Sequence, residues 1–508
     1  MPRNQIELDR TKERALYLQV ADQLRRQIEE GDLAASTRLP ASRTLAKKLG
    51  VNRITVVNAY AELEAEGLVT TRVGSGTYIV GAKSLPDATL SALQAQWRSP
   101  LPPRPPATAN QMITEMMRLA HQPGVISFAG GGPASEFIPV NEFRRALNEV
   151  LRRDGAAALQ YEEAIGYPPL RQTIAQLLRQ QQIKVHGSDV IITAGCQQAV
   201  DIALRVLARG ENSVLAVEEP CYLGLLNLAS SRRITPLGVP MDEHGLQIDK
   251  LEQVILRHRP NLIYVTPSFH NPTGVTMPLE RRRRLLDLAD QYGVPILEDV
   301  SYDYLYYDTP PPPTLKSLDT ADLVFFAGGF SKTLVPGIRI GYLVAPESLQ
   351  NQLISVKQTA DILTSPLNQR ALDLYLRSGH FETHLEQVRQ AYRHRRDLML
   401  AAIERHFPAE VQWHCPQGGI YLWVEMPANG PTAIELYLTA INYNVAFSIG
   451  STFSAGGLFA HALRLNFVAC EPEEIEEGIR RLGKAWKELL ARHVPARHSV
   501  SGLGVTIL

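Results

Sequence analysis

The sequence predicts an α/β protein with two folded parts, an amino-terminal winged helix-turn-helix domain and a large domain built on a mostly parallel sheet. Two observations support this prediction. The first 80 residues contain helical patterns around a short turn, followed by a hairpin pattern centred on glycine. The rest of the chain alternates short apolar runs with helical patterns, which is typical of a parallel sheet covered by helices.

Composition sets the outer limits of the interpretation. The chain has 508 residues, 45% of them hydrophobic, with 52 basic and 52 acidic residues, so a surface for nucleic acid has to be local. The first residues lack a signal-peptide pattern, and no run approaches the roughly 20 apolar residues of a membrane helix. The 4 cysteines have no paired spacing, which argues against a disulfide framework or a zinc site. We therefore expect a cytoplasmic protein with no membrane partner.

Composition also predicts the domain boundaries. We expect a winged helix domain over 1–81, a linker over 82–112, the large domain over 113–496 and a tail of unassigned role over 497–508. The linker contains the run Leu101–Pro106, whose prolines cannot continue a helix or a central strand. A stiff, extended spacer is the preferred interpretation, and a buried strap is the alternative.

The first domain opens with helical patterns in the order of a helix-turn-helix. One apolar stripe runs from Tyr17 to Glu30, and a short helix follows from Ser42, as its N-cap, to Leu49. The next helix begins near Asn52 and places Ile54, Val57, Tyr60, Ala61 and Leu63 on its apolar positions. This spacing suits a recognition helix whose first turn points at a groove of DNA.

Charge and the following hairpin favour the same interpretation. The stretch 38–60 contains five basic residues and no carboxylate, whereas glutamates follow at the far end of the helix. Residues 69–80 form two strand-like halves around a glycine turn, like a wing, in which Gly76 allows close backbone approach to a phosphate. The alternative is a helical dimerisation module whose basic residues form a solvated face.

In the large domain, polar and glycine residues follow the apolar runs directly. Since open α/β sheets bind ligands at the carboxyl ends of their strands, these residues predict a site built from several loops. The expected strands are 190–193, 214–217, 262–266, 295–297, 323–327 and 340–344.

The residues after these runs provide candidates for a pyridoxal 5'-phosphate site. Gly195, Cys196 and Gln197 precede a helix whose backbone N–H groups would bind the phosphate. Tyr222 would lie over the ring, and Asn271 would donate to the ring oxygen. An ordinary strand-to-helix turn, a packed aromatic residue and a simple turn are the alternatives for these three positions.

The charged candidates come later in the chain. Asp299 ends a strand and can pair with the pyridine nitrogen, unless it caps a helix, and Tyr302 can reach the same face. Lys332 and Arg339 share one loop and would supply the covalent anchor and a phosphate-binding guanidinium. Arg464 lies on an alternating strand pattern that exposes it on one face. It would either clamp a substrate carboxylate or make a surface ion pair.

Two family resemblances rest on these residues. The runs Leu39–Arg43, Val51–Val56, Leu63–Val69 and Gly74–Tyr78 resemble the GntR-type winged helix. This resemblance implies that the DNA contacts come from Arg43, Asn52, Arg53, Thr55, Arg72 and Gly76.

Residues 113–490 resemble a fold-type I, aspartate-aminotransferase-like enzyme with a smaller carboxy-terminal α+β subdomain. The resemblance rests on Asn271–Gly274, Asp299 with Tyr302, Ser331-Lys332 with Arg339, and Arg464. It implies an aldimine at Lys332, Asp299 on the ring nitrogen, Asn271 and Tyr302 on the ring oxygen, Tyr222 on the ring face, Gly195–Gln197, Ser331 and Arg339 on the phosphate, and Arg464 on the α-carboxylate.

The same resemblance implies a domain-swapped homodimer in which a tyrosine of the partner subunit reaches the phosphate, and Tyr161 is the matching residue. The sequence departs from the family pattern at two places. Glu162 stands where a glycine usually follows that tyrosine, and Cys196 stands where a small or hydroxylated residue is common.

A GntR-type reader joined to an aminotransferase-like domain is similar to the MocR-type transcriptional regulators. The resemblance implies a dimer that binds a double-stranded DNA operator and senses pyridoxal 5'-phosphate, or an amino compound as its aldimine, at Lys332. The alternative is an active aminotransferase that carries a DNA-binding module. Lys332, Asp299, Asn271 and Arg464, which such an enzyme requires, are all present.

Overall fold

A computed structural model describes residues 6–9, 14–34, 36–72, 75–80, 118, 120, 122–208, 210 and 212–492. The chain divides into two compact units, Met1–Ala107 and Thr108–Leu508, and each is described by itself. The predicted linker over 82–112 and the predicted tail over 497–508 lie outside the described residues.

The first unit has the predicted helix-turn-helix and wing. Its helices are α1 (Leu16–Glu29), α2 (Ser42–Leu49) and α3 (Arg53–Ala65), and its hairpin pairs β1 (Val69–Arg72) with β2 (Gly76–Ile79). Helix α2 ends at Gly50, whose φ of 64° is the left-handed conformation that favours glycine.

The two helix starts differ from each other. Asn52 caps α3, because its side chain accepts a hydrogen bond from the Ile54 amide at 3.0 Å. The prediction of Ser42 as the N-cap of α2 was wrong, since Ala41 occupies that position and makes no side-chain cap. The Ser42 hydroxyl instead accepts a hydrogen bond from Arg53 Nε at 3.4 Å, which joins the beginnings of α2 and α3.

The apolar positions expected for α3 are only partly buried. Val56, Ala59, Tyr60 and Leu63 pack in the core of the first unit. Ile54 and Val57 were expected on the same stripe, but they are 65% and 43% exposed. Ala61, which was also expected on the stripe, is exposed, and the buried Val56 and Ala59 were not selected. The expected stripe did not follow the period of 3.6, which places Ile54, Val57 and Ala61 on the face opposite the core.

The second unit contains an eight-stranded sheet that is mostly parallel, as predicted. Only β11 and β7 run antiparallel to their neighbours. The strand order is β4 (Val190–Thr193), β11 (Gly341–Val344), β10 (Val324–Gly329), β9 (Ile296–Asp299), β8 (Leu262–Val265), β5 (Val214–Glu219), β6 (Thr235–Asp242) and β7 (Gly245–Leu246).

Alternate residues of the central strands face two different helical layers. In β10, Phe325 packs in a core with α8 and α9, whereas Phe326 packs in another core with α7 and α14. Because both faces are covered, the central strands begin as apolar runs, and the carboxylates of β5 and β9 lie at their carboxyl ends. The helices of this unit are α6 (Val140–Asp154), α7 (Pro168–Gln180), α8 (Cys196–Leu207), α9 (Leu223–Ser231), α10 (Ile248–His258), α11 (Leu279–Tyr292), α12 (Leu315–Leu318), α13 (Gln350–Asp361), α14 (Pro366–Arg377), α15 (His380–His406), α16 (Ala433–Ala440) and α17 (Pro472–Arg492).

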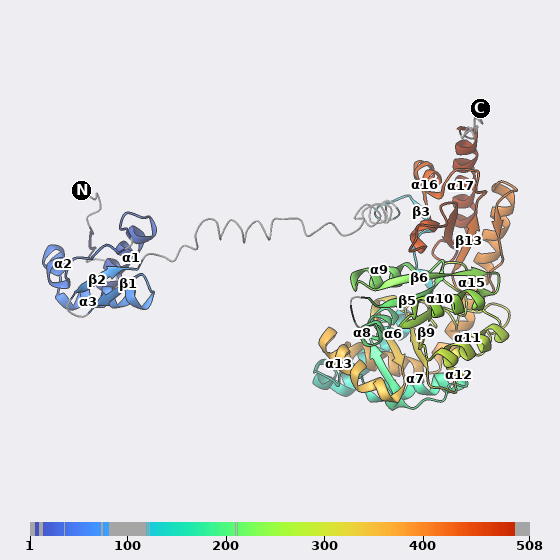
Figure 1. Cartoon of the computed structure of the whole chain (residues 1–508), viewed down its shortest axis with the longest axis horizontal. Coiled ribbons are helices and arrows are strands. Elements are labelled where there is room, and N and C mark those ends of the chain that lie inside the picture. Colours follow the sequence, from blue (N-terminus) through green and yellow to red (C-terminus); the bar gives the residue numbers. More distant parts are fainter. Residues whose placement is uncertain are drawn as a thin grey trace, which may run out of the picture. The chain divides into compact units, whose positions relative to one another are not determined.

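A smaller α+β subdomain completes the second unit, as expected. Its antiparallel sheet has the order β12 (Gln412–Trp413), β13 (Tyr421–Glu425), β16 (Ala462–Asn466) and β15 (Ser448–Ile449). A further pair joins β14 (Val445–Ala446) to β3 (Ile126–Ser127). In Figure 1, β13, α16 and α17 gather at one end of the unit, and α7 and α12 lie at the other.

Short 3-10 helices complete the connections. They are η1 (Ser135–Phe137), η2 (Gly155–Leu159), η3 (Gly187–Asp189), η4 (Pro336–Ile338), η5 (Glu347–Leu349), η6 (Ile441–Tyr443) and η7 (Gly450–Phe453). Among the described residues, no helix has the length and apolar character needed to cross a bilayer.

Candidate functional site

A cavity of about 410 Å³ lies where the large sheet meets the smaller subdomain. Its walls come from loops after β4, β5, β8, β9 and β10 and from strands of the small sheet. Most of the residues predicted for the site line this cavity, namely Cys196, Gln197, Tyr222, Asn271, Asp299, Tyr302, Ser331, Lys332, Arg339 and Arg464. The side chains that follow these strands therefore meet at one cavity, at the edge of the sheet that the topological rule for open sheets indicates.

Lys332 enters the cavity from the loop after β10. Its Nζ donates a hydrogen bond to the carbonyl oxygen of Gly131 at 2.5 Å. A Cβ atom at position 131 would lie 2.8 Å from the Tyr421 hydroxyl and 3.4 Å from Lys332 Nζ. Gly131 therefore leaves room for the amine and the phenol to approach each other.

Asp299 is the last residue of β9 and is only 5% exposed. Its Oδ1 accepts hydrogen bonds from the Ser301 amide at 3.0 Å and the Ser301 hydroxyl at 2.6 Å, and its Oδ2 accepts one from the Tyr264 hydroxyl at 2.8 Å. These donors belong to a turn and a neighbouring strand, not to a helix terminus. The helix-cap alternative for Asp299 does not apply, and the carboxylate is fixed at the cavity wall.

An anion cup forms between the start of α8 and the loop after β10. Gly195 precedes α8 with a φ of 90°, and a Cβ atom there would lie 2.7 Å from Arg339 Nη2. Arg339 donates to the Ala194 carbonyl at 3.1 Å and to the Ser331 hydroxyl at 3.3 Å. The first-turn amides of Cys196 and Gln197 have no hydrogen-bond partner among the described residues. Free amides at a helix N-terminus, a hydroxyl and a guanidinium are the donors that bind phosphate.

Arg464 is buried, with 7% of its surface exposed, so the expectation that its strand exposes it on one face was wrong. Its Nη1 donates to Asn271 Oδ1 at 2.9 Å, and its Nη2 donates to the Ala129 carbonyl at 2.9 Å and to the Ser448 hydroxyl at 3.0 Å. All these partners are neutral, and no carboxylate of the described chain forms an ion pair with Arg464. The surface ion pair is therefore excluded within the described residues.

Two aromatic rings lie close to this guanidinium. Its Cζ lies 4.0 Å from the centroid of Tyr421 and 4.8 Å from that of Phe453. Its Nε is buried and has no hydrogen-bond partner in the part of the chain that the structure describes. A buried cation with an unused donor and no counter-charge is costly, so the site favours an anionic ligand beside it.

Two further polar groups remain available in the cavity. Asn271 Oδ1 accepts a hydrogen bond from Arg464, and Asn271 Nδ2 has no partner among the described residues. Tyr302 and Tyr421 place their hydroxyl oxygens 3.4 Å apart. Burial raises the pKa of Tyr302 well above its ordinary value. Burial would also raise the pKa of Tyr421, but Arg464 and Lys332 beside it lower that pKa below its ordinary value.

The Tyr222 hydroxyl donates to Gln197 Oε1 at 3.0 Å, which fixes its ring at the cavity wall. Cys196 lies near Asp299 and Ser301, and burial, with the charge of Asp299, raises the pKa of its thiol well above the usual value. The thiol is therefore neutral at this wall. Its small size suits a position where a hydroxylated residue was expected.

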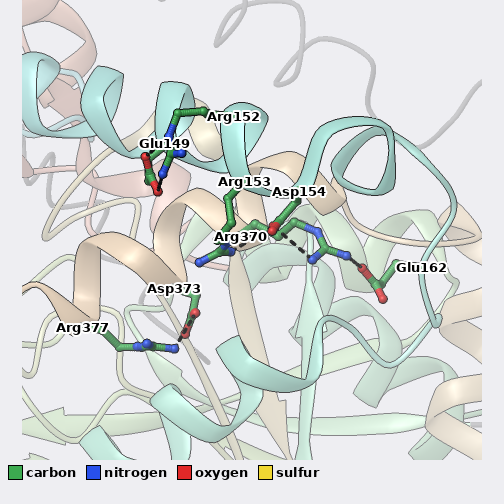
Figure 2. A network of polar contacts seen from close by, with 8 residues as sticks. All are labelled: Glu149, Arg152, Arg153, Asp154, Glu162, Arg370, Asp373 and Arg377. Carbon is green, nitrogen blue, oxygen red and sulfur yellow. Dashed lines mark hydrogen bonds and ion pairs between the residues drawn. The ribbon is translucent and has the colours of Figure 1, made fainter.

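Tyr161 does not reach the cavity of its own chain, and 80% of its surface is exposed. Figure 2 shows the ion pairs beside it, in which Arg370 binds Glu162 at 2.5 Å and Asp154 at 3.4 Å. The Arg370 guanidinium also lies 4.1 Å from the centroid of Tyr167. The departure at Glu162 thus has a structural consequence, because this carboxylate ties the segment that carries Tyr161 to α14.

Sequence reasoning missed several residues of the cavity. The glycine run 130–132 was a usable signal, since Gly130, Gly131 and Gly132 all lie close to the site. No comparable signal in the sequence marked Tyr421, Ser301 or Phe453. These residues come from separate elements, and only the fold brings them to Lys332, Asp299 and Arg464.

The first unit presents the predicted DNA-binding residues on α2, α3 and the hairpin. Arg43 and Arg53 are exposed at the beginnings of two helices, and Thr55 is half-buried. Asn52 is exposed, although its oxygen is used as the cap of α3. Sequence reasoning did not select Arg38, whose guanidinium lies against the hairpin.

The hairpin contributes Gly76 and Arg72. Gly76 has a φ of 120°, and a Cβ atom there would lie 2.7 Å from Arg38 Nε. Gly76 is therefore needed for the approach of Arg38, in addition to any approach of a phosphate. The Arg72 guanidinium lies 5.4 Å from the centroid of Tyr78, which holds it along the hairpin.

Comparison with known proteins relates both units to described families. Residues 16–79 match the family of bacterial regulatory proteins, gntR family, and residues 124–482 match aminotransferase class I and II. An uncharacterized HTH-type transcriptional regulator, YdfD of Bacillus subtilis, is 31% identical over 477 residues, which is 94% of this chain and 97% of that protein. The probable rhizopine catabolism regulatory protein MocR of Rhizobium meliloti is 31% identical over 495 residues, 95% of this chain and 96% of that protein.

The second unit also resembles solved aminotransferases. The structure of LysN, an α-aminoadipate aminotransferase from Thermus thermophilus complexed with N-(5'-phosphopyridoxyl)-L-leucine, aligns with a TM-score of 0.70 and 40% identity. The alignment covers 74% of this chain and 96% of that one.

Proposed function

The chain belongs to the MocR-type regulators, in which a GntR-family domain precedes an aminotransferase class I and II domain, and we propose that it regulates transcription by sensing a ligand at Lys332. The ligand is pyridoxal 5'-phosphate or an amino compound bound to it. One observation supports this proposal above the others. Among the described residues that line the cavity, Lys332, Arg339 and Arg464 are cationic, and Asp299 is the single carboxylate.

The residues of the cavity fit pyridoxal 5'-phosphate, the cofactor of this aminotransferase family. When bound, this cofactor supplies a carbonyl carbon that an amine can attack and a ring that accepts electrons. Lys332 would hold it covalently, Asp299 would keep its ring nitrogen protonated, and Asn271 Nδ2 with Tyr302 would donate to its ring oxygen. Tyr222 would pack against its ring.

The anion cup would take the phosphate. The first-turn amides of Cys196 and Gln197, the Ser331 hydroxyl and the Arg339 guanidinium supply donors, and Gly195 leaves the space that a side chain would fill. A doubly charged phosphate beside a guanidinium and a helix N-terminus offsets the positive charge of this side of the cavity.

Arg464 would bind the carboxylate of the amino compound. Its unused Nε and its planar guanidinium favour a planar anion over a second neutral group. The cofactor would contact Asp299, Lys332 and Arg339. Arg464 is then the one charged side chain left for the amino compound among the described residues that line the cavity, and the lining around Leu223 and Phe453 is uncharged.

The first unit is a DNA-binding domain of the GntR family. We propose that Arg43, Asn52, Arg53, Thr55, Arg72 and Gly76 contact a double-stranded operator and that the regulator is a cytoplasmic, domain-swapped homodimer. Tyr161, which is exposed in the single chain, would reach the phosphate in the partner subunit. We also propose the winged helix over 1–81, the linker over 82–112 and the aminotransferase-like domain over 113–496.

Regulation requires a difference in affinity between two arrangements of the dimer, since a ligand that binds both equally shifts neither. The test follows the visible absorption band of the cofactor-loaded protein and its affinity for operator DNA while amino acids are added without an oxo acid. A persistent band shift with a change in DNA affinity supports a sensor. A band shift that leaves DNA affinity unchanged with every amino acid would contradict regulation by an amino compound.

The second candidate function is transamination. It is favoured by the simultaneous presence of Lys332, Asp299, Asn271 and Arg464 in one cavity and by the 40% identity to a 2-aminoadipate transaminase over 383 residues. In the same titration, conversion of the cofactor to its amine form with release of an oxo acid would establish this activity. The two functions are compatible in one protein.

A further inference from the structure

The outward face of α3 carries two large apolar side chains that the core does not use. Ile54 is 65% exposed and Val57 is 43% exposed, whereas Val56 and Leu63 are fully buried on the other face. Residues three apart are neighbours on a helix surface, so Ile54 and Val57 form one apolar pair, and the exposed Asn58 follows it. Neither side chain of this apolar pair belongs to the buried core of the unit.

The surroundings of this pair are basic. Arg53 is exposed beside Ile54, and it donates to Ser42 at the beginning of α2. The same helix α2 exposes Arg43, Lys47 and Lys48. This charge is complementary to a polyanion and unfavourable for an apolar protein surface.

The acidic end of α3 is tied to the rest of the unit. Glu64 accepts hydrogen bonds from the amide and the hydroxyl of Thr71, at 2.6 Å and 3.1 Å. Glu66 pairs with Arg25 at 2.5 Å. These carboxylates are partnered away from the first turns of α3, so the end that carries Ile54 and Val57 remains the one suited to a polyanion.

We propose that Ile54 and Val57 recognise the methyl groups of thymine in the major groove of the operator. The C5-methyl of thymine is the apolar group that base pairs present in that groove, and the groove admits an α-helix. The adjacent cations would contact phosphates and so place α3, while the apolar pair would read bases. The inference rests on the proposed function, because it requires that this unit binds double-stranded DNA.

Asn58 supports the same specificity. Its side chain is exposed one residue after Val57, and no hydrogen bond to another described residue uses its amide. An asparagine amide can pair with the N6 and N7 positions of adenine, which is the partner base of thymine. The face of α3 therefore suits A·T pairs in the part of the operator that it contacts.

The test replaces thymine by uracil, which removes only the methyl group. Full-length protein first selects duplexes from a random-sequence pool, and a selected duplex is then synthesised with uracil at single thymine positions. Each methyl group in contact with Ile54 or Val57 should contribute about fourfold to affinity. Uracil outside the contacted positions should have no effect and serves as the internal control.

Protein variants assign the effect to the two side chains. Ile54→Ser and Val57→Ser should each lose the preference for thymine over uracil at the one duplex position that the replaced side chain contacts. Ile54→Val should keep that preference. Val80→Ser is the matched control, because Val80 is an exposed apolar residue of the same unit outside α3, with 36% of its surface exposed. Thermal unfolding should change little in all four variants, since none of the three substituted side chains belongs to the buried core of the unit.

Several outcomes would overturn the inference. Wild-type protein that binds all uracil duplexes as tightly as the thymine duplex does not read methyl groups. A preference for thymine that persists in Ile54→Ser and Val57→Ser belongs to other residues. Serine variants that change the oligomeric mass and leave the thymine preference intact would show a protein contact on this face. If no duplex is enriched from the pool, the proposed DNA function fails, and the inference fails with it.

Discussion

Replacing Arg464 with methionine tests the carboxylate site directly. The substitution keeps an unbranched side chain beside the rings of Tyr421 and Phe453 and removes the charge and the unused Nε. A hydrogen bond to a charged group stabilises a complex by about 1.5 to 3 kcal/mol, so affinity for an α-amino acid should fall about 10- to 150-fold. The assay is a titration of the visible absorption band of the cofactor-loaded variant.

Two controls make this prediction specific. The first is the amine that lacks the carboxylate of the same amino acid, which should bind the variant and the wild type equally. The second is Arg389→Met, because the Arg389 guanidinium also lies over a ring, 3.8 Å from the centroid of Tyr306, but does not line the cavity. The assignment of Arg464 is refuted if Arg464→Met binds the amino acid as tightly as the wild type does. It is also refuted if the affinity of the variant for the amine falls as much as its affinity for the amino acid.

Three further predictions concern the anchor, the DNA and the dependence of stability on pH. Lys332→Ala should abolish the fixation of cofactor by borohydride, and a fixed adduct on another lysine would contradict the assignment. Arg53→Ala should weaken operator binding by about 1 to 3 kcal/mol if Arg53 contacts a base. If Arg53 contacts a phosphate, the slope of log affinity against log salt concentration should be smaller by about one. Unchanged binding in a gel-shift series would remove Arg53 from the interface. Burial raises the pKa of Glu298 to about 7 and that of Asp303 to about 8, so both bind a proton in the folded chain where the unfolded chain has lost it. The free energy of unfolding should therefore fall between about pH 5 and pH 8 in urea titrations, and less steeply in Asp303→Asn; an identical slope in that variant would exclude Asp303 as the source.

The sequence predicted six of the eight strands of the large sheet, all except β6 and β7, and through them most of the residues that line the cavity. This was possible because strands buried on both faces are apolar runs and because their carboxyl ends meet at one edge. Asp299 and Lys332 follow such runs directly, so their positions could be inferred from local pattern alone. The fixed period of strands and helices is the physical basis of that success.

Other contacts could not be inferred because they depend on tertiary packing. The alternating pattern around Arg464 indicated a strand, but both faces of that strand are covered, so the guanidinium is buried and not exposed. Tyr421 belongs to β13 and reaches Lys332 only because the small sheet packs beside the loop at Gly131. On α3, the core and the solvent face both carry apolar residues, and the expected stripe combined Ile54 with residues of the core and omitted the buried Val56.

The position of Arg464 suggests how an amino acid could act differently from the cofactor alone. Asp299 ends β9 and Lys332 lies on the loop after β10, both in the large sheet, whereas Arg464 and its partner Ser448 belong to the small sheet. An amino acid would take the place of Lys332 at the carbonyl carbon of the cofactor, so the large sheet would hold it through the cofactor and Arg464 of the small sheet would hold its carboxylate. Such a ligand would connect the two sheets, while an amine without a carboxylate would engage only the large one. Only the first ligand can favour one arrangement of the two sheets, because a ligand shifts an equilibrium only through different contacts in its two states. We therefore expect the amine to shift the absorption band without changing operator affinity, and an equal effect of amine and amino acid on DNA would place the coupling elsewhere.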